Sequence, residues 1–224
     1  MKKDFPEVEE AVRFRSRGGI VKYKDVKVVE NGSIFFADPE IFKVFSFPFK
    51  KGNALTVFKE LNDAVITESA AKKYFGNEEP IDKPLHFNNE DYIVKAVLED
   101  LPATSHLQFT ILLNYKKYIQ LTEGRAETSW GWSDFYTYIL LKPGTDVKAL
   151  QAKMPAFAER YMGDEMKEGG YQQFFDIQPV KDIHLRSDYD YELAGNGNLG
   201  YLKYLGIAAL FILFIAWINY INLS

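Results

Sequence analysis

Residues 204–224 contain no charged side chain, and this uncharged stretch constrains the fold more than any other feature of the chain. As an α-helix it would span roughly 30 Å at about 1.5 Å per residue, which matches the hydrocarbon thickness of a bilayer. Leu, Ile and Phe dominate it between Leu205 and Ile218, and each favours membrane insertion by about 0.3–0.6 kcal/mol. A buried helix of a soluble protein usually keeps a polar stripe, which this stretch lacks through Ile218. The sequence therefore predicts a transmembrane helix over residues 204–224.

The side chains assigned to the bilayer include aromatic residues near both ends of this stretch, where Trp and Tyr form belts at membrane surfaces. The residues that represent the span are Leu205, Phe211, Phe214, Trp217 and Tyr220. The stretch is not a signal peptide, because it lies at the C-terminus and the N-terminus is acidic after its first three residues. We expect the chain to be a piece of a longer membrane protein.

The composition of the chain excludes several classes of function. Its 224 residues include 27 Lys and Arg against 31 Asp and Glu, a formal net charge of −4, so no basic excess is available to bind nucleic acid. A hydrophobic content of 47% and an aromatic content of 16% indicate a folded chain of one or two domains. Because the chain has no cysteine, it can form no disulfide, no thiolate metal site and no Cys nucleophile.

Hydrophobic patterning in the first part of the chain predicts strands and short helices. A hairpin is expected over residues 11–37 with its turn at Asn31-Gly32. A helix is expected to follow, with Asp38 capping its free amides. A buried strand over residues 64–66 precedes a helix that Thr67 caps and Gly76 ends.

The second part of the chain predicts a further set of elements by the same rules. These are a hairpin over residues 85–98, a strand over 109–113, a short helix over 115–121, a strand over 135–141, a helix from about Asp146 that Pro155 splits, and a strand over 173–180. Residues 187–200 are polar and rich in glycine, and we expect a linker there that packs on the domain.

Matches to chemical motifs lack the context that each chemistry needs. Residues 195–200 read G-x-G-x-x-G, but no buried strand precedes them. Ser69 and Lys72 fit S-x-x-K without its partner motifs, and the alternating carboxylates Asp188, Asp190 and Glu192 lack the Gly and Glu of a calcium loop. The histidines His86, His106 and His184 have no zinc-ligand spacing. We therefore predict no catalytic residue, no cofactor and no metal.

Several phrases of the sequence together resemble the extracytoplasmic core domain of MacB-like ABC transporter permeases, also called FtsX-like permeases. The resemblance rests on FPEVE at 5–9, ADPEIFKVFSFPF at 37–49, VITESAAKKYFG at 65–76, EPI at 79–81, YIVKAVLEDLP at 92–102 and WINYINLS at 217–224. Asp82 and Ala96 depart from the family pattern, which more often has glycine there. The chain is similar to the family's segment from the exit of its first membrane helix to the end of its second.

The resemblance implies an α+β fold in which two strand–helix–strand halves, about residues 4–64 and 135–185, form a porter-like subdomain. A smaller mixed α/β subdomain, about residues 65–134, would be inserted between them. Residues 4–200 would lie in the periplasm, followed by the transmembrane helix over 204–224 in the bacterial inner membrane. The implied partners are an ABC ATPase subunit, which would hydrolyse ATP, and a second permease copy in a homodimer. A periplasmic adaptor, or membrane fusion protein, stays open as a further partner.

Two alternatives to a transport permease stay open from the residues. A membrane-tethered sensor or ligand-binding domain would use exposed aromatic side chains, and Trp130 with Trp132 is the candidate contact surface. Packing in the core would explain the same two residues. An enzyme that uses the carboxylates of residues 188–192 is the second alternative. An ATPase partner would favour the permease, and a kinase-like or adaptor partner would favour the sensor.

Overall fold

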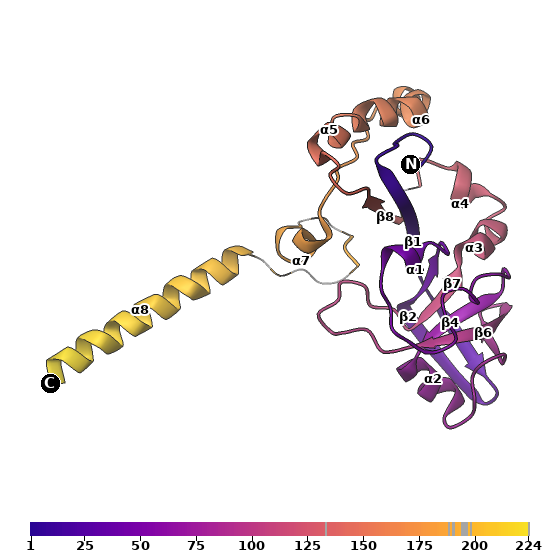
Figure 1. Ribbon diagram of the computed structural model, residues 1–224, viewed down its shortest axis with the longest axis horizontal. Coiled ribbons are helices and arrows are strands. Elements are labelled where there is room, and N and C mark those ends of the chain that lie inside the picture. Colours follow the sequence, from indigo (N-terminus) through magenta and orange to yellow (C-terminus); the bar gives the residue numbers. More distant parts are fainter. Residues whose placement is uncertain (133, 188, 190, 194–196, 198, 224) are drawn as a thin grey trace. The chain divides into compact units, whose positions relative to one another are not determined.

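The computed structural model describes residues 1–132, 134–187, 189, 191–193, 197 and 199–223. They form two compact units, Met1–Ile177 and Gln178–Ser224 (Figure 1). The first unit contains β1 (Val8–Tyr23), β2 (Val26–Ala37), α1 (Ile41–Val44), β3 (Phe49–Lys51), β4 (Asp63–Thr67), α2 (Glu68–Phe75), β5 (Pro84–Phe87), β6 (Glu90–Leu98), β7 (Ile111–Asn114), α3 (Tyr115–Leu121), α4 (Arg125–Thr128), β8 (Tyr136–Leu141), α5 (Val147–Gln151) and α6 (Met154–Gly169). The second contains η1 (Val180–Asp182), α7 (Ile183–Arg186) and α8 (Leu199–Leu223).

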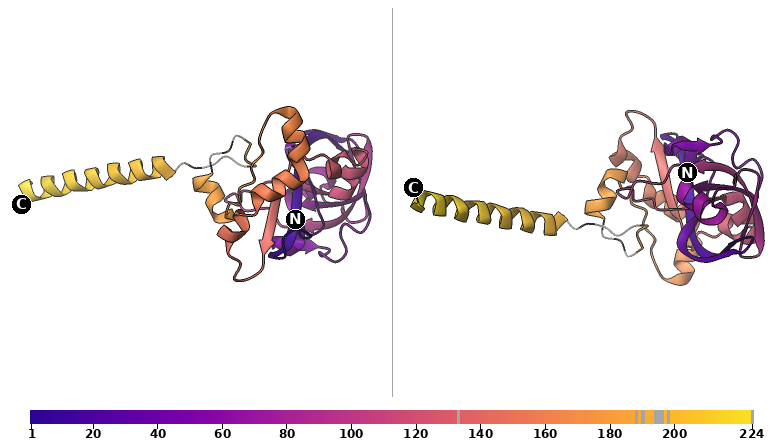
Figure 2. Two further views of the ribbon diagram at one scale, coloured as in Figure 1. Left: turned by 90° about the horizontal axis from the view of Figure 1, so that it is seen from above. Right: turned by 90° about the horizontal axis from the view of Figure 1, so that it is seen from below.

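The strands of the first unit form one mixed sheet, which confirms the predicted α+β class. Its order is β2-β7-β4-β6-β5-β1-β8, with β3 paired to β6. Because β1 also pairs with β2, the strands from β2 to β1 in this order form a closed ring (Figure 2). The pairs β2–β7 and β4–β6 are parallel and the others are antiparallel. The strand β4 lies between β6 and β7, and each of its residues is buried, as expected for a strand covered on both faces.

Buried hydrophobic side chains stabilise the first unit, and two clusters of them fix its helices. The larger one joins the strands to α2 and α3 through side chains that include Ile34, Phe36, Ile66, Tyr74 and Tyr118. The smaller one joins Phe5 and Val8 to Leu150, Met154 and Phe157, so it fixes α5 and α6 beside β1 and β8 (Figures 1 and 2). As predicted, the helical pattern after Asp146 is split, and Pro155 lies in the first turn of α6.

The prediction of the first hairpin turn was wrong. Strand β1 turns into β2 at Lys24 and Asp25, with Tyr23 opposite Val26, and Lys24 takes the positive φ of 50° that such a two-residue turn needs. Apolar alternation continues on both sides of this turn, which sets the register. Asn31-Gly32 instead lies inside β2, beside the register shift between Arg17 and Gly19 of β1. These residues therefore accommodate a β-bulge.

The predicted helix cap at Asp38 was also wrong. The helix α1 has only four residues, its N-cap is Glu40, and no side chain caps it. The carboxylate of Asp38 bonds to Arg13 of β1 instead. By contrast, the side chain of Thr67 accepts the amide hydrogen of Ala70, and α2 ends at Gly76, both as predicted.

The predicted strand over residues 173–180 is absent, since residues 171–179 are described and have no regular structure. The side chain of Gln151 takes the place of a neighbouring strand: its Nε2 donates to the carbonyl of Phe175 at 2.8 Å, and its Oε1 accepts from the amide of Ile177 at 2.7 Å. Backbone groups satisfied by a side chain need no strand partner. The predicted third element of the strand–helix–strand unit is therefore an irregular segment.

Part of the predicted linker over residues 187–200 lies outside the described residues, namely Asp188, Asp190, Ala194, Gly195, Asn196 and Asn198. The carboxylates Asp188 and Asp190 and half of the G-x-G-x-x-G match belong to that set. The division into subdomains at about residues 64 and 135 stays a prediction.

Candidate functional site

A row of arginines on β1 faces the helices and aromatic rings that follow β7. Arg13, Arg15 and Arg17 are spaced by two residues, which puts their side chains on one face of the strand. Each guanidinium lies over an aromatic ring: Arg13 over Tyr115 at 4.2 Å, Arg15 over Trp132 at 5.5 Å and Arg17 over Tyr118 at 5.3 Å. The row therefore binds α3 and Trp132 to the sheet through cation–π contacts.

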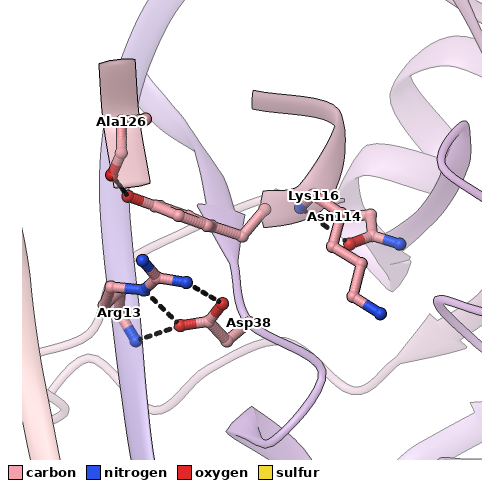
Figure 3. A network of polar contacts seen from close by, with 6 residues as sticks. Arg13, Asp38, Asn114, Lys116 and Ala126 are labelled. Atoms are coloured by element: carbon pink, nitrogen blue, oxygen red, sulfur yellow. Dashed lines mark hydrogen bonds and ion pairs between the residues drawn. The ribbon is translucent and has the colours of Figure 1, made fainter. Parts of the chain in front are cut away.

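Arg13 is held by a forked ion pair with Asp38 (Figure 3). Its Nε and Nη2 donate to the two carboxylate oxygens at 2.8 and 3.0 Å, and its backbone amide donates to the same carboxylate at 2.9 Å. Burial alone would lower the pKa of Arg13, but the hydrogen bonds and negative charge of Asp38 raise that pKa above its ordinary value. This pair joins β1 to the end of β2 and is satisfied within the chain.

The first turn of α3 places the ring that covers Arg13. Asn114 caps this helix, because its Oδ1 accepts the amide hydrogen of Lys116 at 3.0 Å, and the hydroxyl of Tyr115 donates to the carbonyl of Ala126 at 3.2 Å (Figure 3). Burial raises the pKa of Tyr115 to about 12, although the charge of Arg13 acts against that rise. The phenol is therefore neutral at physiological pH and serves as a hydrogen-bond donor between α3 and α4.

Arg15 is held mainly by Asp134, while its Nε is buried without a hydrogen-bond partner among the residues that the structure describes. Its Nη1 donates to the carbonyl of Asp134 at 2.6 Å, and its Nη2 lies 2.5 Å from the carboxylate of the same residue. The indole of Trp132 donates to that carboxylate at 3.2 Å. Trp132 also contacts the rings of Tyr118 and Phe135.

Arg17 and Arg125 differ from these two arginines. Both side chains are exposed, and neither forms an ion pair with a residue that the structure describes. Arg17 lies over Tyr118, and Arg125 lies over Trp132 at 5.7 Å. The two rings are neighbours, with centroids 6.1 Å apart. We call the set Arg17, Tyr118, Trp132 and Arg125 the arginine–aromatic surface.

The structure places the two predicted contact tryptophans in different surroundings. Trp132 packs on the larger hydrophobic cluster. Trp130 stacks on Tyr161 of α6 with centroids 4.4 Å apart and meets Phe157 edge-on at 5.5 Å. Trp130 keeps 38% of its surface exposed. The two tryptophans therefore pack against different groups of side chains, and only Trp132 contacts an arginine of the row. Sequence analysis missed this row, although Arg-x-Arg-x-Arg in a strand already places three cations on one face.

Two further motif residues, Ser69 and His86, have structural partners. The hydroxyl of Ser69 donates to Asp100 at 2.5 Å, and its amide donates to the same carboxylate at 2.9 Å. The hydroxyl is therefore hydrogen-bonded to Asp100 and not to Lys72, the partner that the S-x-x-K chemistry requires. His86 pairs with Asp91 at 2.9 Å. Across the described part of the chain, no group of three or more His, Asp and Glu could hold a metal ion.

An open groove of about 610 Å³ lies along α2 and contains groups of both charges. Two of its three lysines face carboxylates: Lys50 lies 3.7 Å from both Glu68 and Glu99, and Lys51 lies 2.5 Å from Glu79. Charges that are paired in this way leave the groove without a dominant sign.

The helix α8 has the properties predicted for the membrane segment. Residues Gly200–Leu223 are long and apolar enough to cross a bilayer, with a mean hydropathy of 2.1. The side chains of the predicted span are all exposed, namely Leu205, Phe211, Phe214, Trp217 and Tyr220. Apolar side chains on every side of a helix are favourable in lipid and unfavourable in water.

Comparison with solved structures identifies several proteins with a similar fold. The chain aligns with a domain described as part of a permease protein from Porphyromonas gingivalis (TM-score 0.60, 21% identity, 71% of this chain and 73% of that one). It aligns with the periplasmic region of MacB from Actinobacillus actinomycetemcomitans (TM-score 0.56, 16% identity, 78% and 81%). It also aligns with the extracellular domain of the noncanonic ABC-type transporter YknZ from Gram-positive bacteria (TM-score 0.50, 13% identity, 74% and 79%). At these identities the likeness shows a shared fold.

Sequence comparison shows the family. No curated protein matches the chain at a significant level. The family model of the MacB-like periplasmic core domain matches residues 1–157, which is most of the chain and all but the end of the first unit. The chain therefore belongs to the MacB-like periplasmic core domain family of ABC transporter permeases, and it carries an apolar helix that could cross a membrane.

Proposed function

We propose that the chain is the periplasmic part of an ABC transporter permease subunit in the bacterial inner membrane, with α8 as one of its membrane helices. A partner ATPase hydrolyses ATP in the cytoplasm, and the first unit moves in response and promotes efflux or export of a lipoprotein or peptide on the periplasmic side. The permease acts as a homodimer, and a periplasmic adaptor is a further candidate partner. The chain itself supplies no catalytic group and no cofactor.

The observation that carries this proposal is the combination of a family domain with an apolar helix in the same chain. The family match covers residues 1–157, and α8 provides a segment through which a membrane-bound ATPase could act on that domain. A mechanical role also agrees with the arginine row, where charged groups bind the helices to the sheet and carry no arrangement for acid–base chemistry.

The compartment is tested by thiol labelling of the full-length parent protein, because the chain has no cysteine of its own. Leu55→Cys places a thiol on a side chain that is 83% exposed, and Val65→Cys places one on a side chain that is 0% exposed. In spheroplasts, a membrane-impermeant maleimide should label the first variant at once and the second only after denaturation. Labelling of Leu55→Cys only after lysis would put the domain in the cytoplasm and overturn the proposal.

The ATPase partnership is tested by purifying the same full-length protein with the ATPase subunit of its transporter. The two should copurify in lipid nanodiscs, and the ATPase rate should rise when the permease is present. If Leu55→Cys is labelled from outside but no ATPase copurifies, the sensor or ligand-binding alternative gains support over the permease.

A further inference from the structure

We propose that the arginine–aromatic surface is a docking site for a segment of a partner protein that carries at least two carboxylates. The surface consists of Arg17, Tyr118, Trp132 and Arg125, and it goes beyond the transport role because it defines a specific interaction. It lies wholly within the first unit.

The first argument is the difference between paired and unpaired arginines in one cluster. Arg13 and Arg15 have their guanidinium groups bound by Asp38 and Asp134. Arg17 and Arg125 lie over rings of the same cluster and have no carboxylate partner among the residues that the structure describes. Two positively charged guanidinium groups therefore lie beside two neighbouring rings, and together they attract anionic groups.

The second argument is the geometry of an arginine on an aromatic ring. A guanidinium that stacks on a ring loses water from one face, while its N–H groups stay available at the edge for a bidentate bond to a carboxylate. Stacking also restricts the side chain before it binds, which lowers the entropy cost of binding. Both free arginines have this support, at 5.3 Å over Tyr118 and 5.7 Å over Trp132.

The third argument concerns the class of partner. The whole chain is acidic, with a formal net charge of −4, so it does not have the broad positive field that attracts nucleic acid or an anionic bilayer. The exposed Arg17 and Arg125 beside the partly buried Trp132 match the residue types enriched in protein–protein hot spots, and the buried Tyr118 supports Arg17.

The three tryptophans of the chain provide the test. The full chain is labelled with 5-fluorotryptophan and held in zwitterionic nanodiscs, which gives one fluorine NMR signal each for Trp130, Trp132 and Trp217. The probe is the capped peptide Gly-Glu-Tyr-Glu-Gly, and the matched peptide has Gln in place of Glu. We expect the acidic peptide to shift the Trp132 signal in a saturable way, and the Gln peptide to bind at least tenfold more weakly.

Variants assign the effect to the surface. Replacing both Arg17→Gln and Arg125→Gln should weaken binding of the acidic peptide at least tenfold. The matched control is Arg160→Gln, since Arg160 is also exposed and lies over a ring, that of Tyr161 at 5.8 Å, but outside the surface. Unchanged Trp130 and Trp217 signals show that the double arginine variant keeps its fold.

Three outcomes would overturn the proposal. They are equal shifts from the Glu and Gln peptides, no shift at Trp132 with the acidic peptide, and retained binding in the double arginine variant. A Trp132 shift on transfer to nanodiscs with anionic lipid, with none from the acidic peptide, would instead assign the surface to lipid. None of these readings depends on ATP hydrolysis, so the docking site can fail while the transport role stands.

Discussion

At the scale of single residues, the first unit depends on charged groups whose partners lie far away in the sequence. Arg13 and Asp38 are separated by 25 positions and Arg15 and Asp134 by 119. The Arg13–Asp38 pair is largely shielded from water, with 33% of the arginine side chain and 13% of the aspartate side chain exposed. Removing one partner leaves the other charge desolvated, which costs more than the pair itself contributes.

We therefore predict that Asp38→Asn lowers the free energy of unfolding by about 2 kcal/mol, below the range for fully buried pairs because Arg13 is partly exposed. Glu159→Gln, which removes an exposed pair with Lys167, is the control and should cost less than about 0.5 kcal/mol. Urea unfolding of the full chain in detergent measures both. Equal small losses in the two variants would contradict a structural role for Asp38.

Glu30 gives a residue-scale prediction about pH. Its carboxylate is buried and accepts hydrogen bonds from Ser33 at 2.9 Å, from Lys73 at 2.6 Å and from the hydroxyl of Tyr74. Burial raises the pKa of Glu30, but these three hydrogen bonds outweigh burial and hold that pKa below its ordinary value of 4.5. A lowered pKa in the folded state means that the unfolded chain binds the proton more tightly. The carboxylate thus stabilises the fold fully above pH 4.5 and less as the pH falls through the folded pKa.

Glu30→Gln should accordingly lower the free energy of unfolding by about 1–2 kcal/mol at pH 7, and the difference from the unchanged protein should shrink below pH 4.5. Denaturant titrations at pH 7 and pH 3.5 measure this difference. The control is Glu79→Gln, an exposed carboxylate that pairs with one lysine, for which we expect little loss at either pH. A loss in Glu30→Gln that is the same at both pH values would rule out the carboxylate charge as its cause.

At the scale of elements, local signals predicted those elements that local contacts stabilise. Thr67 and Gly76 delimit α2 because a cap hydrogen bond and a positive φ of 61° need only nearby residues. The predicted strand after α6 fails for the opposite reason. The backbone carbonyl of Phe175 and the backbone amide of Ile177 form hydrogen bonds with the side chain of Gln151, which lies more than twenty positions earlier. No pattern within residues 173–180 contains that information.

Gln151→Ala is the element-scale prediction. It removes two hydrogen bonds from the segment at Phe175 and Ile177, so we expect a loss of about 1–2 kcal/mol in stability and faster hydrogen exchange at the Ile177 amide. Gln172→Ala, on an exposed side chain of the same segment, should change neither quantity. Hydrogen exchange followed by mass spectrometry measures the amides. Protection of Ile177 that survives in Gln151→Ala would show that other contacts hold the segment.

At the scale of the whole molecule, the apolar helix α8 favours a bilayer, whereas the first unit buries its apolar side chains and favours water. The Leu, Ile and Phe residues between Leu205 and Ile218 favour insertion by several kcal/mol in total, whereas one arginine at a helix centre costs about 2.5–3.5 kcal/mol. Two central arginines should therefore cancel the preference of α8 for the bilayer.

We predict that the double replacement Phe211→Arg and Phe214→Arg moves a large part of the chain from the membrane pellet to the carbonate-soluble fraction. Phe174→Arg is the control, because Phe174 is an aromatic residue of the first unit that is 67% exposed, and it should leave the chain in the pellet. Immunoblots of the two fractions measure the distribution. A double variant that stays in the pellet would mean that other parts of the chain hold it there.

The sequence by itself determined the apolar helix that could cross a membrane, the cap and end of α2, and the hairpin of β5 and β6. These features depend on composition, periodicity and the chemistry of neighbouring residues, which the chain displays directly. The α+β class and the family followed from the resemblance of several sequence segments to a known family. Only the tertiary structure decided the turn at Lys24, the partner of Asp38, the irregular course of residues 171–179 and the arginine–aromatic surface. Each depends on strand register or on contacts between residues far apart in the sequence, and such contacts can override local preferences.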